Sequence, residues 1–334
     1  ANEIRHDKLK KIIHYKGASL KVYDKKIFYF PKFFHPDPTV KRQTGFLIPR
    51  LEENSTTGLS LKLPYFIAVA ENKDITFSPR FFNDNKFLLQ SELRQKNKRS
   101  DHMADLSQFV SNDKSSKGHL FYNFKKNYES KNFDDIELDI NIEQVSDDTY
   151  LKAYKIKSPL INNTSNLINS INLDLYDESQ TINASLNVYE DLSKIDSDRY
   201  EYVPNFSFSK ILNDNYSFRS SGYYKNYNTN ITEKVLINDL EFNSDPKYLN
   251  NGIINNKKLL IKNVNSEARN SKKFKNKDTS SLVPTLQNNY TYPLQKQTDK
   301  FNYTLTPKFT LNLSTPHTKD VSKNNAKINY DNIY

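Results

Sequence analysis

The residues that most often do chemistry in proteins are few and scattered in this chain. Six histidines stand singly, at positions 6, 14, 35, 102, 119 and 317, without an H-E-x-x-H motif or any other metal-ligand spacing. Cysteine is absent, so disulfides, thiolate metal sites and a thiol nucleophile are excluded within this chain. We therefore expect no metal site and no cofactor.

Paired carboxylates are the remaining chemical candidates. Asp134-Asp135 and Asp147-Asp148 could in principle serve as the acid and base of glycoside hydrolysis. Adjacent residues on a strand point to opposite faces, however, and acidic residues are common in turns. We expect no catalytic residues and no enzymatic activity.

The charge balance is basic. The chain has 49 Lys and Arg against 39 Asp and Glu, a formal net charge of +10. This excess suits nucleic acid, an anionic membrane surface or a phosphorylated lipid, and it also suits a simple bias towards Lys and Asn. Because the basic residues are scattered and no C-x-x-C finger or Gly-rich loop accompanies them, we expect no nucleic-acid partner.

Strict alternation of apolar and polar residues marks the strands. The clearest run is Asp135 to Gln144, and Thr181 to Tyr189 and Ile171 to Leu175 repeat the pattern. The period is two rather than 3.6, which indicates strands. For the first run we expect Ile136, Leu138, Ile140 and Ile142 to face lipid and Glu137, Asp139, Asn141 and Glu143 to face a polar lumen.

The strand pattern predicts a transmembrane barrel, whose strands are about ten residues long, apolar on one face and separated by polar turns. The longest apolar run, Tyr65 to Ala70, is far shorter than the roughly 20 residues of a membrane helix. A soluble sandwich or β-helix has shorter strands and more glycine than the six glycines here. The polar stretch Asn263 to Asp278 is expected to be a long extracellular loop or rim.

These strands follow an unusual stretch, Ile27 to Pro49. It is strongly aromatic, yet prolines remove backbone donors that a sheet would need, so we expect a strand end that cannot pair along its whole length. A basic pair and a second apolar piece follow, stopped by Pro49. A proline-rich connection between two domains would show the same residues.

The Ile27 to Pro49 stretch resembles the junction in the LPS-assembly outer-membrane protein family LptD (OstA/Imp), where a periplasmic β-jellyroll passes into a very large barrel. The resemblance is kept in order over about the first two hundred residues and is thin from Asn205 onward. It rests on Phe28-Tyr29-Phe30-Pro31, Lys41 to Pro49, Leu63-Pro64-Tyr65-Phe66, Asp74 to Pro79, Glu92-Leu93-Arg94, Val145 to Asp148, Tyr150-Leu151 and Tyr202-Val203-Pro204.

The resemblance implies an all-β chain in two parts. Residues 1–40 would be the end of a periplasmic β-jellyroll and the junction, and residues 41–334 would be the first portion of an incomplete antiparallel outer-membrane β-barrel. The implied function is insertion of lipopolysaccharide into the outer leaflet of the cell outer membrane, with the N-terminal part in the periplasm. The implied partners are lipopolysaccharide, an LptE-like lipoprotein plug, an LptA-like periplasmic bridge protein and the barrel-assembly machinery. The alternatives are another outer-membrane barrel, such as a porin or receptor, and then a soluble glycan-binding β-protein.

Site residues follow from this resemblance and from the proline chemistry. A lateral gate, a place where the barrel wall can part sideways, is expected at the junction because lost ladder bonds lower the cost of opening. The gate and junction residues are Pro31, Pro36, Pro38, Pro49 and Gly45. The residues expected to contact lipid phosphates are Lys41 and Arg42, and the aromatics expected along the lipid path are Phe28, Phe30, Phe33 and Phe34.

Overall fold

The computed structural model describes residues 1–9, 11–22, 25–40, 42–54, 57–83, 86–111, 116–195, 197–227 and 231–315. Strands account for 69% of the residues and helix for 2%, which confirms the all-β prediction. In this described part, no helix is long and apolar enough to cross a membrane.

The strands fall into three sheets. A separate sheet holds β1 (Glu3–Asp7), β2 (Ile12–Val22) and β3 (Lys25–Pro36). A large antiparallel sheet of 18 strands, consistent with a β-barrel, holds β4 to β20 and β23. A hairpin holds β21 (Leu294–Gln297) and β22 (Asn302–Leu305).

The strands of the large sheet are β4 (Gly45–Phe46), β5 (Arg50–Asn54), β6 (Gly58–Lys62), β7 (Tyr65–Ala70), β8 (Lys73–Phe82), β9 (Phe87–Lys96), β10 (Ser100–Val110), β11 (Ser116–Tyr128), β12 (Asp135–Val145), β13 (Asn166–Tyr176), β14 (Gln180–Asp191), β15 (Tyr200–Ile211), β16 (Tyr216–Tyr227), β17 (Ile231–Asn243), β18 (Lys247–Tyr248), β19 (Ile254–Arg269), β20 (Thr279–Thr291) and β23 (Lys308–Ser314). The helical segments are α1 (Tyr150–Ala153) and a 3-10 turn, η1 (Ser197–Arg199). The chain forms two compact units, the first comprising residues 1–124 and 142–164 and the second residues 125–141 and 165–334.

In the three-stranded sheet of the first unit, β3 pairs with β2 on both sides of Pro31, but the ladder has no pair at Pro31 itself. The expectation of a strand that cannot pair along its whole length is therefore confirmed at this proline. Within the described sheet β3 is an edge strand, where a proline is tolerated because no second neighbour needs its N–H. Gly17, which lies between the paired residues Lys16 and Ala18 of β2, has a φ of +63°.

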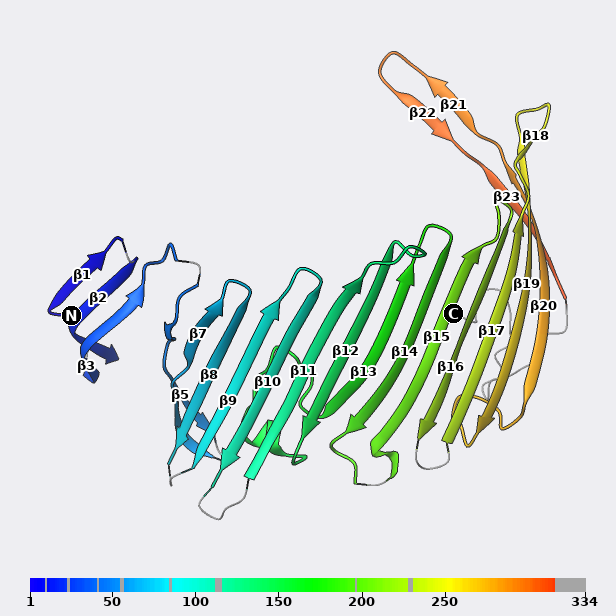
Figure 1. Ribbon diagram of the computed structural model, residues 1–334. Helices are drawn as coiled ribbons and strands as arrows, with labels where there is room; N and C mark the ends of the chain where they lie inside the picture. Colours follow the sequence, from blue (N-terminus) through cyan, green and yellow to red (C-terminus); the bar gives the residue numbers. More distant parts are fainter. Residues whose placement is uncertain are drawn as a thin grey trace. The chain divides into compact units, whose positions relative to one another are not determined.

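In the second unit, strands β13 to β17 lie side by side (Figure 1), and apolar positions match from strand to strand. In register, Leu138 pairs with Leu173, Leu173 with Ala184, and Ala184 with Phe206. The opposite face is polar, with Asp139 paired to Asn172, Asn172 to Ser185, and Ser185 to Asn205. We call these the apolar face and the polar face of the second unit. The register confirms the alternation read from the sequence.

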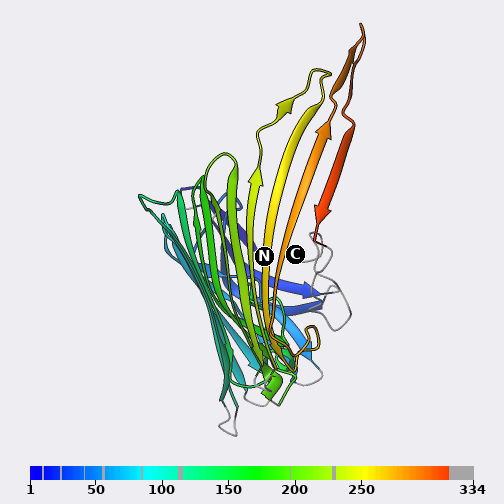
Figure 2. The same ribbon diagram turned by 90° about the vertical axis from the view of Figure 1, so that its right-hand side faces the viewer.

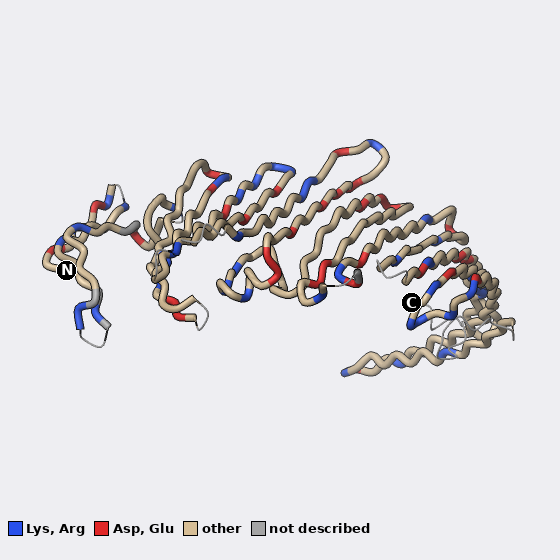
Figure 3. The backbone as a smooth tube through the Cα atoms, turned by 90° about the horizontal axis from the view of Figure 1, so that it is seen from below, with Lys and Arg blue, Asp and Glu red and all other residues tan. Residues whose placement is uncertain are grey.

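The polar stretch Asn263 to Asp278 is divided between strand and loop, which corrects part of the sequence expectation. β19 continues to Arg269, and only residues 270–278 connect it to β20. The charged residues of this region are compatible with a strand because they find partners across the ladder: Glu267 Oε2 lies 2.9 Å from Lys234 Nζ on β17. Figure 3 shows charged residues of both signs spread along the strands.

The run from Phe301 to Leu313 is two strands with different partners. β22 pairs with β21, whereas β23 pairs with β20, and Pro307 lies between β22 and β23. The β21–β22 hairpin thus continues beyond the ends of β20 and β23 (Figure 2).

Candidate functional site: a proline break and a buried polar network

The large sheet begins with four short strands, and two of the gaps between them contain a proline. β4 and β5 are separated by Leu47-Ile48-Pro49, and β6 and β7 are separated by Leu63-Pro64. The paired residues on either side of the gap are Phe46 with Tyr65 and Arg50 with Lys62. Three residues on one side therefore face two on the other. We call residues 47–49 and 63–64 the proline break.

The proline break keeps little of the ladder. Leu47 N donates to Pro64 O at 2.8 Å, but Pro49 has no N–H to donate. Leu63 N instead turns to Pro79 O on β8 at 3.0 Å. Ile48 is 81% exposed, so packing does not compensate at this point. The ladder is therefore interrupted between Phe46 and Arg50.

Ion pairs to Asp74 hold the segment that precedes β4. Asp74 Oδ2 accepts from Arg42 Nη2 at 2.6 Å, and Asp74 Oδ1 accepts from Arg94 Nε at 2.9 Å. Arg42 Nη1 also donates to the Glu71 carbonyl. Beside them, Ala68 N donates to Thr44 Oγ1 at 3.1 Å. We call Arg42, Asp74 and Arg94 the Asp74 cluster; it ties the incoming chain to the β7–β8 hairpin.

The structure brings together only part of the expected gate. Gly45 and Pro49 lie at the proline break, whereas Pro31 and Pro36 belong to β3. Pro38 lies in the turn after β3, where Val40 N donates to Asp37 O at 2.9 Å. Hydrogen bonds from the backbone and hydroxyl of Thr39 lower the pKa of Asp37.

The two residues expected to contact lipid phosphates, Lys41 and Arg42, have different outcomes. Lys41 lies outside the described residues. Arg42 is occupied by Asp74 and by the Glu71 carbonyl.

The aromatic residues form one short chain of contacts and one separate pair. Phe28 lies 4.8 Å from Phe30 and Phe30 lies 5.5 Å from Phe33 between ring centroids. Phe34 packs instead against His14, at 6.0 Å.

At the opposite ends of strands β8 to β11, the connection between β12 and β13 folds against the sheet. Its backbone carbonyls accept from three strands: Asn54 Nδ2 to Ala153 O at 2.6 Å, Arg80 Nη1 to Tyr154 O at 2.7 Å, and Gln90 Nε2 to Lys157 O at 3.0 Å. Buried polar side chains that satisfy one another in this way hold a segment in one position.

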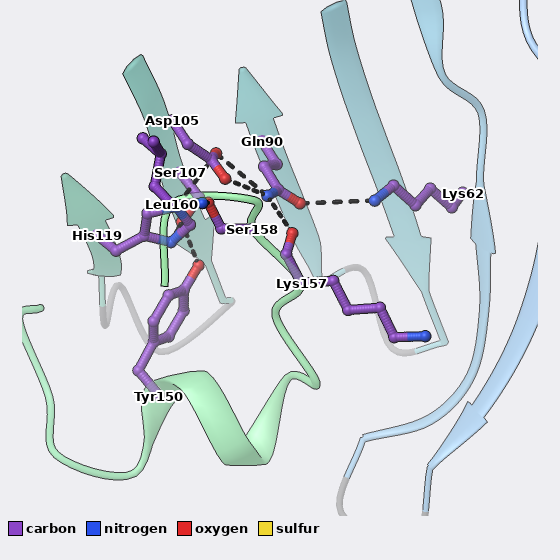
Figure 4. Close-up of polar contacts among 9 residues, drawn as sticks. All are labelled: Lys62, Gln90, Asp105, Ser107, His119, Tyr150, Lys157, Ser158 and Leu160. Atoms are coloured by element: carbon purple, nitrogen blue, oxygen red, sulfur yellow. Dashed lines mark hydrogen bonds and ion pairs between the residues drawn. The ribbon is translucent and has the colours of Figure 1, made fainter. Parts of the chain in front are cut away.

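Tyr150, the first residue of α1, reaches deepest into the sheet (Figure 4). Its hydroxyl lies 2.6 Å from Ser107 Oγ, which in turn lies 2.6 Å from His119 Nδ1. His119 Nε2 lies 3.2 Å from Asp105 Oδ1, and both Asp105 oxygens accept from Gln90 Nε2. Burial raises the pKa of Tyr150 to about 12, so its hydroxyl stays protonated near neutral pH.

The Ser107–His119–Asp105 arrangement superficially resembles a catalytic triad. Asp105 and the His119 side chain have no exposed surface, and Ser107 is capped by Tyr150. A nucleophile that substrate cannot reach does no chemistry, so the arrangement serves to fasten α1. Across the described ranges, no group of three or more His, Asp or Glu side chains could hold a metal ion.

Sequence reasoning missed several residues that the structure makes prominent. Pro64 was noted only for resemblance, although its carbonyl accepts from Leu47 N across the break. Asp74 and Arg94 carried no motif of their own. The burial of Tyr150 could have been predicted, because leaving a large aromatic side chain exposed near the Asp147-Asp148 turn costs free energy.

Taken together, the fold and the break define an all-β membrane-barrel type of chain whose first strands are weakly paired. In comparison with curated proteins, the chain is similar to the LPS-assembly protein LptD of several bacteria. It is 24% identical to that of Pseudoalteromonas atlantica over 197 residues, 59% of this chain and 25% of the relative. It is 26% identical to that of Pseudomonas entomophila over 240 residues, 69% of this chain and 25% of the relative.

A shorter match, to LptD of Nitrosococcus oceani, is 33% identical over 82 residues, 25% of this chain and 11% of the relative. The chain spans about a quarter of the length of the first curated relatives. These matches confirm that the chain is LptD-like and corresponds to part of a longer relative. No family model matches the chain. A bacterial polysaccharide outer membrane secretin aligns with 79% of this chain and 91% of its own at 11% identity, but its TM-score of 0.29 is too low to indicate a shared fold.

Proposed function

We propose that this chain takes part in placing lipopolysaccharide in the outer leaflet of the cell outer membrane, as transport without catalysis. The observation that carries the proposal is the combination of LptD similarity with the proline break in the first strands. A barrel wall with a polar inner face and an apolar outer face separates the two halves of an amphiphile. The sugar and phosphate head cannot cross hydrocarbon unaided, so a sideways opening has to let it pass.

We place the lateral gate at the proline break rather than along β3. Opening a strand pair costs the free energy of its ladder bonds and packing, and both are reduced between residues 46 and 50. Pro31 and Pro36, by contrast, lie in β3, whose ladder with β2 continues on both sides of Pro31. Pro38 shapes the turn into the junction.

The contacts of the junction suggest how the strands are oriented across the membrane. Arg42 binds the β7–β8 turn, and the β9–β10 turn lies beside it, since Lys96 N donates to Asn72 O at 2.8 Å. If residues 1–40 lie in the periplasm, these turns share the periplasmic end. Because antiparallel strands alternate, the α1 connection and the 270–278 loop then lie at the external end.

The remaining expectations belong to this proposal. Residues 1–40 act as the periplasmic end of a jellyroll and residues 41–334 as barrel wall, and Phe28, Phe30 and Phe33 offer an apolar path for acyl chains. Arg42 positions the junction through Asp74, and Lys41 remains the candidate for lipid phosphate. An LptE-like plug, an LptA-like bridge and the barrel-assembly machinery are the proposed partners.

Photocrosslinking in living cells tests the function. A photoreactive residue at Phe30 or Phe33 should yield lipopolysaccharide adducts, whereas the same residue at Leu9, which is 97% exposed in a turn, should yield few. Adducts with equal yield at Leu9, or none at any position in a folded protein, would remove lipopolysaccharide as the cargo.

A further inference from the structure

The apolar face of the second unit contains a groove of about 970 Å³ near the external ends of β15, β16, β17, β19 and β20. It forms because Gly222 has no side chain between its register partners Phe206 and Leu236. A Cβ at Gly222 would lie 3.0 Å from the Phe206 ring and 2.7 Å from the Val235 carbonyl oxygen. The hollow is therefore part of the strand packing, and its walls are apolar.

One side of the groove adjoins a row of polar side chains that crosses four strands. Ser220 Oγ donates to Asn238 Oδ1 at 2.8 Å, and Asn238 Nδ2 donates to Asn263 Oδ1 at 3.2 Å. Asn265 Nδ2 donates to the same Asn263 oxygen at 2.6 Å, and Asn265 Oδ1 accepts from Ser280 Oγ at 2.8 Å. Polar side chains that face only acyl chains cost free energy, whereas a lipid with a polar head can form hydrogen bonds with them.

The rim of the groove carries charges of both signs, from Lys234, Glu267 and Asp278. Lys234 Nζ lies 2.9 Å from Glu267 and 5.9 Å from the centre of the Tyr224 ring. Arg269 lies 3.5 Å from the same carboxylate, so two cations share one anion.

The loop that follows carries four lysines, at positions 272, 273, 275 and 277, against one carboxylate, Asp278. Its start is fixed because the buried Ser271 hydroxyl donates to Glu233 at 2.5 Å and accepts from two backbone N–H groups.

We propose that this groove binds one phosphorylated, acylated lipid of the outer leaflet. An acyl chain lies on Phe206 and Leu236, the polar row bonds the head, and Lys234 with the lysine-rich loop takes the phosphate by charge-assisted hydrogen bonds. The inference rests on the proposed function in one respect: it requires the apolar face to meet lipid with the 270–278 loop at the external end. The site belongs to the second unit and the proline break to the first.

Native mass spectrometry of the protein in detergent micelles tests the site, with phosphatidylglycerol and diacylglycerol of identical acyl chains as probes, because only the first carries a phosphate. We expect about tenfold stronger retention of phosphatidylglycerol, the size of one charge-assisted hydrogen bond. Lys234→Gln should remove most of this preference. Lys210→Gln is the matched control, because Lys210 lies on the same face at the other end of β15, paired with Phe218. Leu236→Asn should weaken both lipids together.

Equal retention of the two lipids by the unchanged protein, or an equal loss in Lys234→Gln and Lys210→Gln, would overturn the site. Displacement of phosphatidylglycerol by inorganic phosphate alone would show that the lysines bind phosphate without an acyl chain, and would overturn it as well. Strand content from circular dichroism and insertion into vesicles are measured on the same samples. A wall that inserts but binds no lipid refutes this inference alone, whereas a chain that never inserts refutes the proposed function.

Discussion

We expect Asp74 to set the free energy with which the junction docks on the β7–β8 hairpin. Its carboxylate is only 12% exposed and accepts from two arginines, of which Arg42 is 35% and Arg94 50% exposed. Charge-assisted bonds contribute about 1.5 to 3 kcal/mol each when buried, and exposure of the arginines reduces that value. We therefore expect Asp74→Asn to cost about 2 kcal/mol of docking free energy, or about 30-fold in the docking equilibrium.

The absence of cysteine makes this measurable by disulfide formation. Gly45 and Phe66 are register partners, and no heavy atom lies within 4 Å of a Cβ built at Gly45, so the pair Gly45→Cys and Phe66→Cys has room to form. Asp74→Asn should slow crosslinking of this pair in a fixed redox buffer. Asp101→Asn, which removes an exposed ion pair with Lys96 at the neighbouring turn, should leave the rate unchanged.

A double-mutant cycle of Arg42→Gln with Asp74→Asn should then show coupling, because the two residues act on one contact. Additive effects, or an unchanged rate in Asp74→Asn, would show that the Asp74 cluster does not hold the junction.

Three further predictions concern the wall and the α1 connection. Leu138→Arg should destabilise the protein in bilayers by about 2 to 4 kcal/mol if Leu138 lies near mid-membrane, while Asn172→Arg on the polar face should be tolerated; equal costs in a denaturant titration would reverse the face assignment. Tyr150→Ala should lower the free energy of unfolding by about 3 to 5 kcal/mol and Tyr150→Phe by about 1 kcal/mol, whereas Tyr176→Ala, at a residue 53% exposed, should change it little; thermal unfolding distinguishes these values, and a silent Tyr150→Ala would contradict the buried contact. Hydrogen bonds from Lys117 and Thr149 lower the pKa of Asp147, so its stabilising contribution is full above the ordinary value of 3.8 and is lost as pH falls through the lower folded value; protease cleavage near residues 146–149 should rise in that acid range in the unchanged protein and be independent of pH there in Asp147→Asn.

Strand type and face could be predicted because alternation is a local property. Asp135 to Gln144 was expected as a strand and is found as β12, and the matched apolar register of its neighbours follows from burying one face. Pro31 interrupts the β2–β3 ladder as the sequence reading expected, but β3 continues beyond it, because an edge strand tolerates a proline and sequence alone does not show that β3 is an edge. Asn263 to Arg269 misled the sequence reading, because cross-strand partners of β19 were not visible in a single chain segment.

The candidate site could be predicted in position but not in composition. Pro49 and Gly45 mark the break through backbone chemistry that any sequence shows. The Asp74 cluster joins residues 32 and 20 positions apart, and the Ser107–Tyr150 contact spans 43 positions. Contacts of that range depend on strand register and on how the α1 connection folds back, which no local pattern encodes.

A reversible lock across the proline break tests the central claim most directly. In cells whose only LptD-like protein carries this chain, the disulfide between Gly45→Cys and Phe66→Cys would hold β4 to β7 when oxidised. The account predicts that oxidation stops the appearance of new lipopolysaccharide at the cell surface, that reduction restores it, and that barrel assembly is the same in both states. Normal export through a fully crosslinked protein would contradict a gate at this position.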